Sequence, residues 1–301
     1  MIISSRMQSV YEGMINTSKQ QRIIEYLSDD NLRGRATGTL QAQMVAKWLR
    51  DEFERYGLKP AVDGYYYQQF VVDSVRRGRN VVAMVPSRRP SDEYIIVGAH
   101  YDHIGSLNGY VYNGADDNAS GVAVLLTLAE MYSVARNAGW GPDKNIIFVA
   151  FDAKEKDSMG AAHFVKNLPC PKDKIIASIN IDQIGTTLEP LDKERPNPYF
   201  LIALGENYMK SGLQGMVDWV NWRYKVGLSI DHKFYGSEAF TEIAYNMSDQ
   251  IAFRAAGIPC VYFTSGFHSH TYKTTDDPDL IDYPVLAKRT LLIFYVISAY
   301  Q

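Results

Sequence analysis

The sequence predicts an α/β protein built as a three-layer sandwich, in which a mixed, mostly parallel sheet lies between layers of helices. Three apolar runs without polar alternation predict strands buried on both faces, at residues 94–98, 145–151 and 175–181. Helical spacing of apolar residues between these runs predicts helices at about 118–135 and 158–168. Strands that alternate with helices along the chain in this way are typical of α/β sandwiches.

The remaining elements extend this pattern toward both ends of the chain. Apolar residues between Leu40 and Tyr56 recur at helical spacing, and Gly57 follows directly as a helix stop. Aromatic and β-branched segments predict further strands, and an apolar C-terminal run predicts a terminal helix packed on the core. These strands cover 65–75, 81–85, 199–204 and 261–264, the terminal helix covers 291–300, and 190–198 is predicted to be a loop. Because no linker-like change of composition divides residues 1–301, we expect a single domain.

Composition excludes several classes of protein. Hydrophobic residues make up 46% of the chain, enough for a large core and too many for a disordered protein. The formal net charge of −3 gives no basic surface of the kind that binds nucleic acid. The longest apolar stretches, about ten residues, predict no membrane span. The chain opens without a secretory signal, which leaves a cytoplasmic protein and a mature exported form both open. Cys170 and Cys260 lack ligand-like spacing and are expected to be buried free thiols.

Polar side chains stand where each buried strand is predicted to end. His100 and Asp102 follow the first strand, Glu155 follows the second and Asp182 ends the third. In open α/β sheets, ligands bind in the crevice at the carboxyl ends of the strands. We therefore expect these side chains to converge, although they lie far apart in the sequence.

A pair of carboxylates before the helix at 118 adds to this group. Helix capping accounts for one acidic residue there, but it does not account for both Asp116 and Asp117. Several carboxylates around His100 would repel one another without a cation, and mixed histidine and carboxylate ligands suit zinc. Asp102, two residues after His100, is placed to orient the histidine ring from behind, and Asp116 is expected beside the ligands rather than among them.

The order and spacing of several sequence blocks resemble the co-catalytic di-zinc aminopeptidase family. Its relatives include glutaminyl cyclases, glutamate carboxypeptidases and the transferrin receptor ectodomain. The resemblance covers nearly the whole chain, in the blocks YLSDDNLRGRATGT, RNVVAMVP, GAHYDH, GADDNASG, FVAFDAKEK, INIDQIG, SDQIAFRAAGIP and YKTTDDPDLIDY. It implies the zinc-dependent exopeptidase fold and removal of N-terminal residues from peptides or small aminoacyl substrates by metal-activated water.

The resemblance also implies a role for individual residues. His100 and Asp182 match ligands of one zinc, Asp117 matches the carboxylate that bridges both zincs, and Glu155 matches a ligand of the other zinc. Family members carry a cis peptide after the bridging aspartate, so the bond between Asp117 and Asn118 is expected to be cis. His103 lies next to this site in the sequence but matches no role, and His163 and His232 are expected to be structural.

Two positions depart from the family pattern. Lys154 stands where the family has the glutamate that acts as general base. Counting back from Asp276 places Tyr272 where the family has its last histidine ligand; the rival candidate is His270, and His268 is a weaker one. Lys154 is either an internal cation that replaces one zinc or a side chain turned outward to solvent.

These departures imply one zinc or none, where an intact family member holds two. The chain is then either an aminopeptidase-like hydrolase with a replaced base or a pseudopeptidase that binds a peptide or a protein partner. Glutaminyl cyclase activity is less expected, because the cyclases use the equivalents of Asp117 and Glu155 together with the missing histidine and the missing glutamate.

Overall fold

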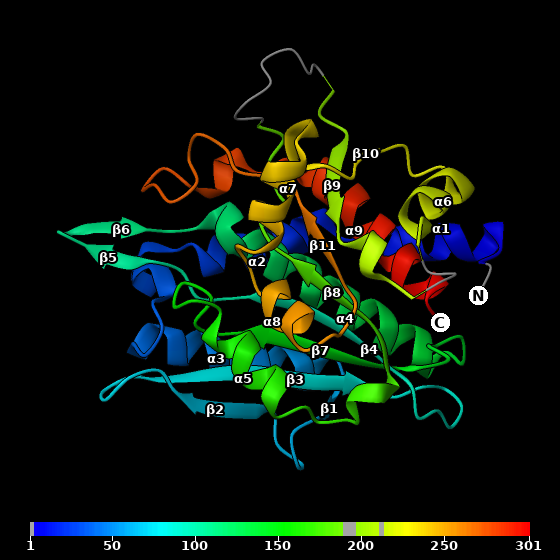
Figure 1. The fold of residues 1–301 in the computed structure, drawn as a ribbon, viewed down its shortest axis with the longest axis horizontal. Helices are drawn as coiled ribbons and strands as arrows, with labels where there is room; N and C mark the ends of the chain where they lie inside the picture. The colour runs from blue at the N-terminus through cyan, green and yellow to red at the C-terminus, as the bar shows by residue number, and fades with distance from the viewer. Residues whose placement is uncertain (1–2, 189–196, 211–213) are drawn as a thin grey trace.

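A single large sheet runs through the computed structural model, which describes residues 3–188, 197–210 and 214–301 (Figure 1). The predicted loop at 190–198 lies outside the described residues except for its last two. The sheet has nine strands in the order β1-β3-β7-β4-β8-β11-β9-β10, and β2 also pairs with β3. Their bounds are β1 Lys59–Pro60, β2 Tyr67–Val71, β3 Arg77–Val85, β4 Tyr94–His100, β7 Asn145–Phe151, β8 Ile175–Ile181, β9 Phe200–Leu204, β10 Ser229–Asp231 and β11 Cys260–Thr264.

The centre of the sheet is parallel and its flanks are antiparallel. β4 pairs in parallel with β7 and β8, and β8 pairs in parallel with β11. On the flanks, β3 runs antiparallel to β7 and β9 runs antiparallel to β11. The predicted mixed sheet between helices is therefore confirmed, and the carboxyl ends of β4, β7 and β8 meet at one edge.

Helices cover both faces of the sheet. One buried cluster joins the sheet to α1 Ser5–Met14, α2 Thr17–Leu27, α3 Leu40–Arg55, α4 Gly121–Asn137, α6 Met216–Tyr224 and α9 Tyr283–Ala299. A second cluster packs α5 Met159–Lys166 and α8 Gln250–Ala255 on the opposite face. α7 Glu238–Tyr245 packs beside β9 and β11, and a projecting hairpin forms from β5 Gly105–Leu107 and β6 Tyr110–Tyr112. Among the described residues, the stretch 115–137 has the length and composition of a membrane span, but 89% of its apolar window is buried inside the protein, as in a core helix.

Several predicted elements have other bounds in the structure: the terminal helix predicted at 291–300 spans Tyr283–Ala299, and the strand predicted at 81–85 spans Arg77–Val85. Two further differences have local causes. The strand predicted at 65–75 ends at Val71, because the Asp73 carboxylate accepts the backbone N–H groups of Val75 and Arg76 and turns the chain. The helix predicted from residue 118 begins at Gly121, because residues 115–120 form an irregular turn that carries Asp117.

Candidate metal centre

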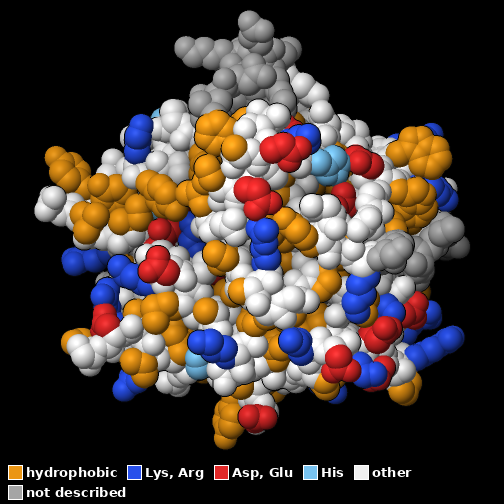
Figure 2. All heavy atoms as spheres, in the orientation of Figure 1, with side chains coloured by type: hydrophobic (Ala, Val, Ile, Leu, Met, Phe, Trp, Pro, Cys, Tyr) orange, Lys and Arg blue, Asp and Glu red, His pale blue; other side chains and the backbone are white. Residues whose placement is uncertain are grey.

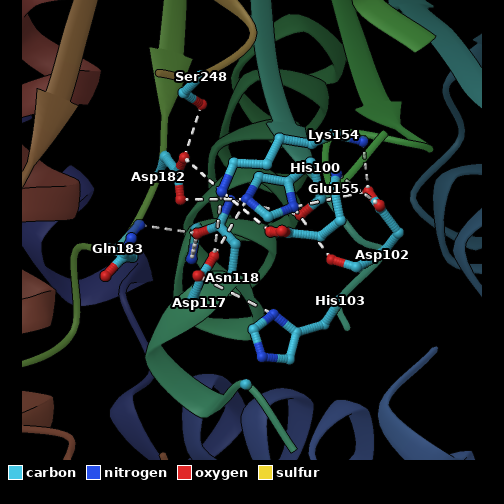
Figure 3. A network of polar contacts seen from close by, with 12 residues as sticks. His100, Asp102, His103, Asp117, Asn118, Lys154, Glu155, Asp182, Gln183 and Ser248 are labelled. Atoms are coloured by element: carbon cyan, nitrogen blue, oxygen red, sulfur yellow. Dashed lines mark hydrogen bonds and ion pairs between the residues drawn. The ribbon is translucent and has the colours of Figure 1, made fainter. Parts of the chain in front are cut away.

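Residues from three neighbouring strand ends and one turn meet at the carboxyl edge of the sheet (Figure 3). His100 ends β4, Asp182 directly follows β8, Glu155 lies in the turn after β7, and Asp117 lies in the irregular turn before α4. His100 Nε2 is 3.1 Å from Asp182 Oδ1 and 3.3 Å from Asp117 Oδ1. One ligand atom each from His100, Asp117 and Glu155 lie within 4.8 Å of one another. The structure thus brings together the four residues predicted as ligands, and their role as ligands stays a prediction.

Asp102 ties two of these strand ends together. Its carboxylate oxygens accept the backbone N–H groups of Lys154 and Glu155 at 3.0 and 3.1 Å, and the Thr37 hydroxyl at 3.2 Å. His100 Nδ1 lies 3.1 Å from the backbone carbonyl of Asp102, and 3.6 Å from its carboxylate. The main chain of Asp102 therefore fixes the ring more closely than its side chain does, and Nε2 is left to face the other ligands.

Asp276 holds the turn that carries Asp117 through hydrogen bonds to its backbone. The two oxygens of Asp276 accept the backbone N–H groups of Asp116 and Asp117 at 2.9 and 3.0 Å. The bond between Asp117 and Asn118 is cis, which confirms that prediction. Both carboxylate oxygens of Asp117 are buried and lack a hydrogen-bond partner among the described residues.

Asp116 points away from this group and serves a separate contact. Its Oδ1 accepts the backbone N–H of Gly185 at 2.6 Å, and its Oδ2 lies 3.1 Å from His268 Nε2. The carboxylate thus links the turn before α4 to the segment after β8 and to the loop after β11.

Lys154 points into the centre of the cluster. Its side chain is only 4% exposed, so the alternative of an outward-facing lysine is wrong. Nζ lies 3.0 Å from Glu155 Oε1, 3.7 Å from Asp117 Oδ1 and 3.8 Å from Asp182 Oδ2. It also donates to the Tyr272 hydroxyl at 3.1 Å. The ammonium group therefore stands among the same carboxylates that would surround a metal ion.

The electrostatics of the cluster keep this lysine charged. Burial lowers the pKa of Lys154, but the carboxylates of Asp117, Asp182 and Glu155 outweigh burial and raise it well above its ordinary value. Burial, together with the charge of Asp117, raises the pKa of Glu155 to about 7. Burial also opposes protonation of His100, yet the neighbouring Asp182 raises its pKa well above the usual range.

The candidates for the last ligand lie at different distances from the cluster. The Tyr272 hydroxyl reaches it through Lys154, and burial raises the pKa of this phenol to about 12, so it stays protonated near neutral pH. The rival, His270, has its Nδ1 2.8 Å from the hydroxyl of Thr275 at the surface. His268 is buried against Asp116. The gap-free alignment, which places Tyr272 at this position, agrees with the geometry.

Sequence reasoning missed several residues that shape the site. The Ser248 hydroxyl donates to Asp182 Oδ2 at 2.6 Å, while Asp182 Oδ1 faces His100 Nε2 at 3.1 Å. The next residue, Asp249, is fully buried, and burial raises its pKa to about 7. Arg35 is also buried, and it donates to the carbonyls of Tyr101, Asn113 and Gly114. These hydrogen bonds connect the loop after His100 to the loop before Asp117. In the sequence, these residues were marked only by their place in two of the blocks that resemble the family, SDQIAF and RGRATGT.

The donor set fits one zinc ion better than two, and Lys154 Nζ lies near donors of both positions, 3.0 Å from Glu155 Oε1 and 3.7 Å from Asp117 Oδ1. Tetrahedral zinc with bonds of about 2.0 to 2.1 Å needs donor atoms about 3.3 Å apart, close to the spacing of His100 Nε2 from Asp117 and Asp182. Asp117 Oδ1, buried without a hydrogen-bond partner, matches a metal ligand. At the second position, the carboxylate of Glu155 faces the ammonium group of Lys154, which in turn binds the protonated phenol of Tyr272. A second zinc ion would have no nitrogen ligand there and would be repelled by the ammonium group.

Comparison with known proteins agrees with this arrangement. The model of peptidase family M28 matches residues 80–297. The chain belongs to peptidase family M28. This match includes all four predicted ligands as well as Lys154 and Tyr272.

Similar proteins carry related names within this family. The chain is 30% identical over 162 residues to a "Probable zinc metalloprotease" of Pyrenophora tritici-repentis, covering 51% of this chain and 36% of that protein. An aminopeptidase of Aneurinibacillus sp. strain AM-1 superposes with a TM-score of 0.71 at 14% identity, over 96% and 95% of the two chains. A glutaminyl cyclase of Fimbriiglobus ruber gives 0.74 at 18% identity, over 94% and 95%. These structures share the M28 fold, and the chain spans about a third of the length of the fungal relative.

Proposed function

We propose that this M28 chain binds the N-terminal end of a peptide and hydrolyses it very slowly or not at all. The observation that carries the proposal is the position of Lys154, whose Nζ lies 3.0 Å from Glu155 and 3.7 Å from the bridging Asp117. A lysine ammonium stands where the second metal ion of an M28 aminopeptidase would be needed, and the glutamate that would act as base is absent.

Repulsion between Lys154 and a second zinc is large on the scale of binding energies. Two unit charges 4 Å apart interact with roughly 4 kcal/mol at the effective dielectric typical of protein sites, and a divalent ion doubles this. The carboxylates that would bind the ion are already neutralised in part by the ammonium group. Lys154 is also a poor substitute for the missing base, since its pKa is raised and it stays protonated.

The first metal position is retained in this proposal. His100, Asp117 and Asp182 would hold one zinc ion, which would supply a Lewis acid that polarises a peptide carbonyl. The chain's own residues keep this position ready, because Ser248 and Asp102 fix the orientation of Asp182 and His100. One zinc then serves to anchor a ligand rather than to drive rapid hydrolysis.

An apolar groove beside the metal centre favours a peptide with an apolar first residue. Its volume is about 310 Å³, and its lining is almost wholly apolar: Phe234, Tyr235, Phe240, Ile243, Ala244, Met247 and Phe267. Met247 directly precedes Ser248, which contacts Asp182, and Phe267 directly precedes His268, which contacts Asp116. Figure 2 shows hydrophobic side chains on the surface beside α7, with acidic side chains next to them.

The proposal is tested by measuring binding and hydrolysis on the same substrates. The natural protein is incubated with leucyl and alanyl anilides, short peptides with an apolar first residue and a glutaminyl peptide, with zinc or with chelator. We expect saturable binding of the apolar peptides by calorimetry and little or no release of product. High turnover that chelator abolishes would show a working aminopeptidase with an unfamiliar base, and conversion of the glutaminyl peptide would show a cyclase; either result overturns the proposal.

A further inference from the structure

His103 is a buried histidine next to the metal centre to which neither the family pattern nor the proposed function gives a role. It is the third residue after His100, and its side chain is fully buried below Asp117 (Figure 3). Both ring nitrogens are buried and lack a hydrogen-bond partner among the residues that the structure describes. A buried polar group left unpaired costs about 1 to 3 kcal/mol, so such a ring calls for a partner.

The nearest unpaired group is the bridging carboxylate itself. His103 Nδ1 lies 4.0 Å from Asp117 Oδ2, and this oxygen is also buried without a hydrogen-bond partner in the described chain. The other oxygen, Oδ1, faces His100 Nε2 at 3.3 Å and Lys154 Nζ at 3.7 Å. The two oxygens of Asp117 therefore face different neighbours, with the cations on the side of Oδ1 and the histidine on the side of Oδ2.

Packing holds the ring of His103 in this place. Gly114 leaves the space for it, since a Cβ at Gly114 would lie 2.6 Å from His103 Cδ2. The carbonyl of Gly114 is in turn bound by the buried Arg35. A hydrogen bond from nitrogen to a carboxylate oxygen is about 2.7 to 3.2 Å long, so a shift of about 1 Å between ring and carboxylate would form it.

We infer that His103 is a positioning residue for Asp117. Its Nδ1–H donates to Oδ2, which fixes the rotation of the carboxylate and leaves Oδ1 for the zinc ion held with His100 and Asp182. Without this donor the carboxylate of Asp117 is free to rotate, and the zinc position loses a prearranged ligand. This inference rests on the zinc position of the proposed function.

Two substitutions of His103 separate hydrogen bonding from packing. His103→Asn keeps a donor, because the amide nitrogen of asparagine can take the place of Nδ1, whereas His103→Leu fills similar space with no donor. His163→Leu is the control, since His163 stacks on the ring of Phe70 at 5.2 Å, as His103 stacks on the ring of Tyr272 at 6.3 Å, but it lies on α5 and is only partly buried. The measured quantity is the zinc dissociation constant, by competition with a chromophoric chelator, together with the visible spectrum of the cobalt-loaded protein.

We expect His103→Leu to weaken zinc binding by about 10- to 100-fold and to change the cobalt spectrum, as loss of a partner behind a metal ligand does. His103→Asn should stay within about threefold of the natural protein, and His163→Leu should not differ from it. Equal weakening by Leu and Asn would show a packing role and overturn the inference, as would no effect of either.

A second measurement does not depend on zinc or on the folding of the leucine variant. In natural protein labelled with ¹⁵N-histidine, nitrogen NMR should show the proton of His103 on Nδ1, with the signal assigned by its loss in His103→Asn. A proton on Nε2 instead would overturn the inference. If the natural protein binds no zinc, the zinc position of the proposed function fails while this measurement still decides the role of His103.

Discussion

In the proposed function, the ligand set of an M28 peptidase is preserved on one side of Asp117 and replaced by protein charge on the other side. His100 and Asp182 lie on the preserved side, with their other atoms bound by Asp102 and Ser248. On the replaced side, Lys154 and Tyr272 bind each other at 3.1 Å. We propose that Lys154 and Tyr272 act as one unit, because the tyrosine at the predicted position of the missing histidine accepts a hydrogen bond from the lysine that stands among the carboxylates.

The largest expected effect comes from reversing both changes on the replaced side. Lys154→Glu combined with Tyr272→His should raise kcat/KM for a leucyl anilide by at least about 10³ in the presence of zinc, because a general base alone contributes about 10² to 10⁴. Each single change should give less than about tenfold, since Lys154 repels the second metal in one and the nitrogen ligand is missing in the other. Steady-state hydrolysis by the four proteins measures this.

A charge control makes the result specific to the site. Lys156→Glu introduces the same charge change two residues away on the surface and should leave hydrolysis unchanged. Additive gains from the two single changes would contradict the view that Lys154 and Tyr272 form one unit.

A smaller effect is expected on stability when the internal cation is removed. Lys154→Met leaves the carboxylates of Asp117, Asp182 and Glu155 without their ammonium partner, and breaking a buried ion pair from one side costs about 3 to 5 kcal/mol. The free energy of unfolding of the metal-free variant should fall by about this amount in urea, and saturating zinc should restore part of it. Lys47→Met is the control, because the exposed pair of Lys47 and Asp51 contributes less than about 1 kcal/mol. An unchanged stability would show that Lys154 does not balance the carboxylates.

The sequence predicted the preserved side better than the replaced side, for physical reasons. The strands 145–151 and 175–181 have the predicted bounds, because runs buried on both faces leave a clear apolar signal. The residues at their ends converge as expected from parallel strands. The sequence did not predict the direction of Lys154, because a lysine rotamer depends on charges and hydrogen-bond acceptors from separate segments, here Asp117, Asp182 and Tyr272.

The residues that surround the predicted ligands and hydrogen-bond to them or to their loops were the hardest to predict. Ser248 and Arg35 act through contacts across 66 to 79 residues of sequence, and a lone serine or arginine has an ordinary surface role more often. The helices α6 to α8 were also missed, because they are short and their apolar residues are partly exposed.

Asp249 allows the preserved side to be probed through pH. Burial raises its pKa to about 7 from an ordinary value of 3.8, so in the folded protein it keeps its proton where the unfolded chain has lost it. Its contribution to stability is therefore present below pH 4 and is lost as the pH rises toward 7. Asp249→Asn removes this dependence and should stabilise the protein by up to about 4 kcal/mol at pH 8, with little effect at pH 4.

Urea unfolding of both proteins at several pH values measures this difference, with Asp279→Asn on the surface as the control. Lower stability of Asp249→Asn than of the natural protein at pH 8, with the difference vanishing toward low pH, would mean that the carboxylate of Asp249 is charged and bound in the folded protein. The preserved side would then carry one more negative charge than the structure indicates.

The smallest expected effect concerns the bond between the two replaced residues. Tyr272→Phe removes the hydroxyl that accepts from Lys154 and should cost about 1 kcal/mol of stability, since hydrogen bonds to charged groups are worth slightly more than neutral ones and this ring is 39% exposed. In the Lys154→Met background the same change should cost nothing measurable, because the donor is already absent. A double-mutant cycle of urea unfolding measures the coupling energy between the two changes, which we expect to be about 1 kcal/mol. This coupling tests whether Lys154 and Tyr272 act as one unit. Equal costs in both backgrounds would mean that Tyr272 stabilises the loop by itself, and that the two departures from the M28 pattern are independent.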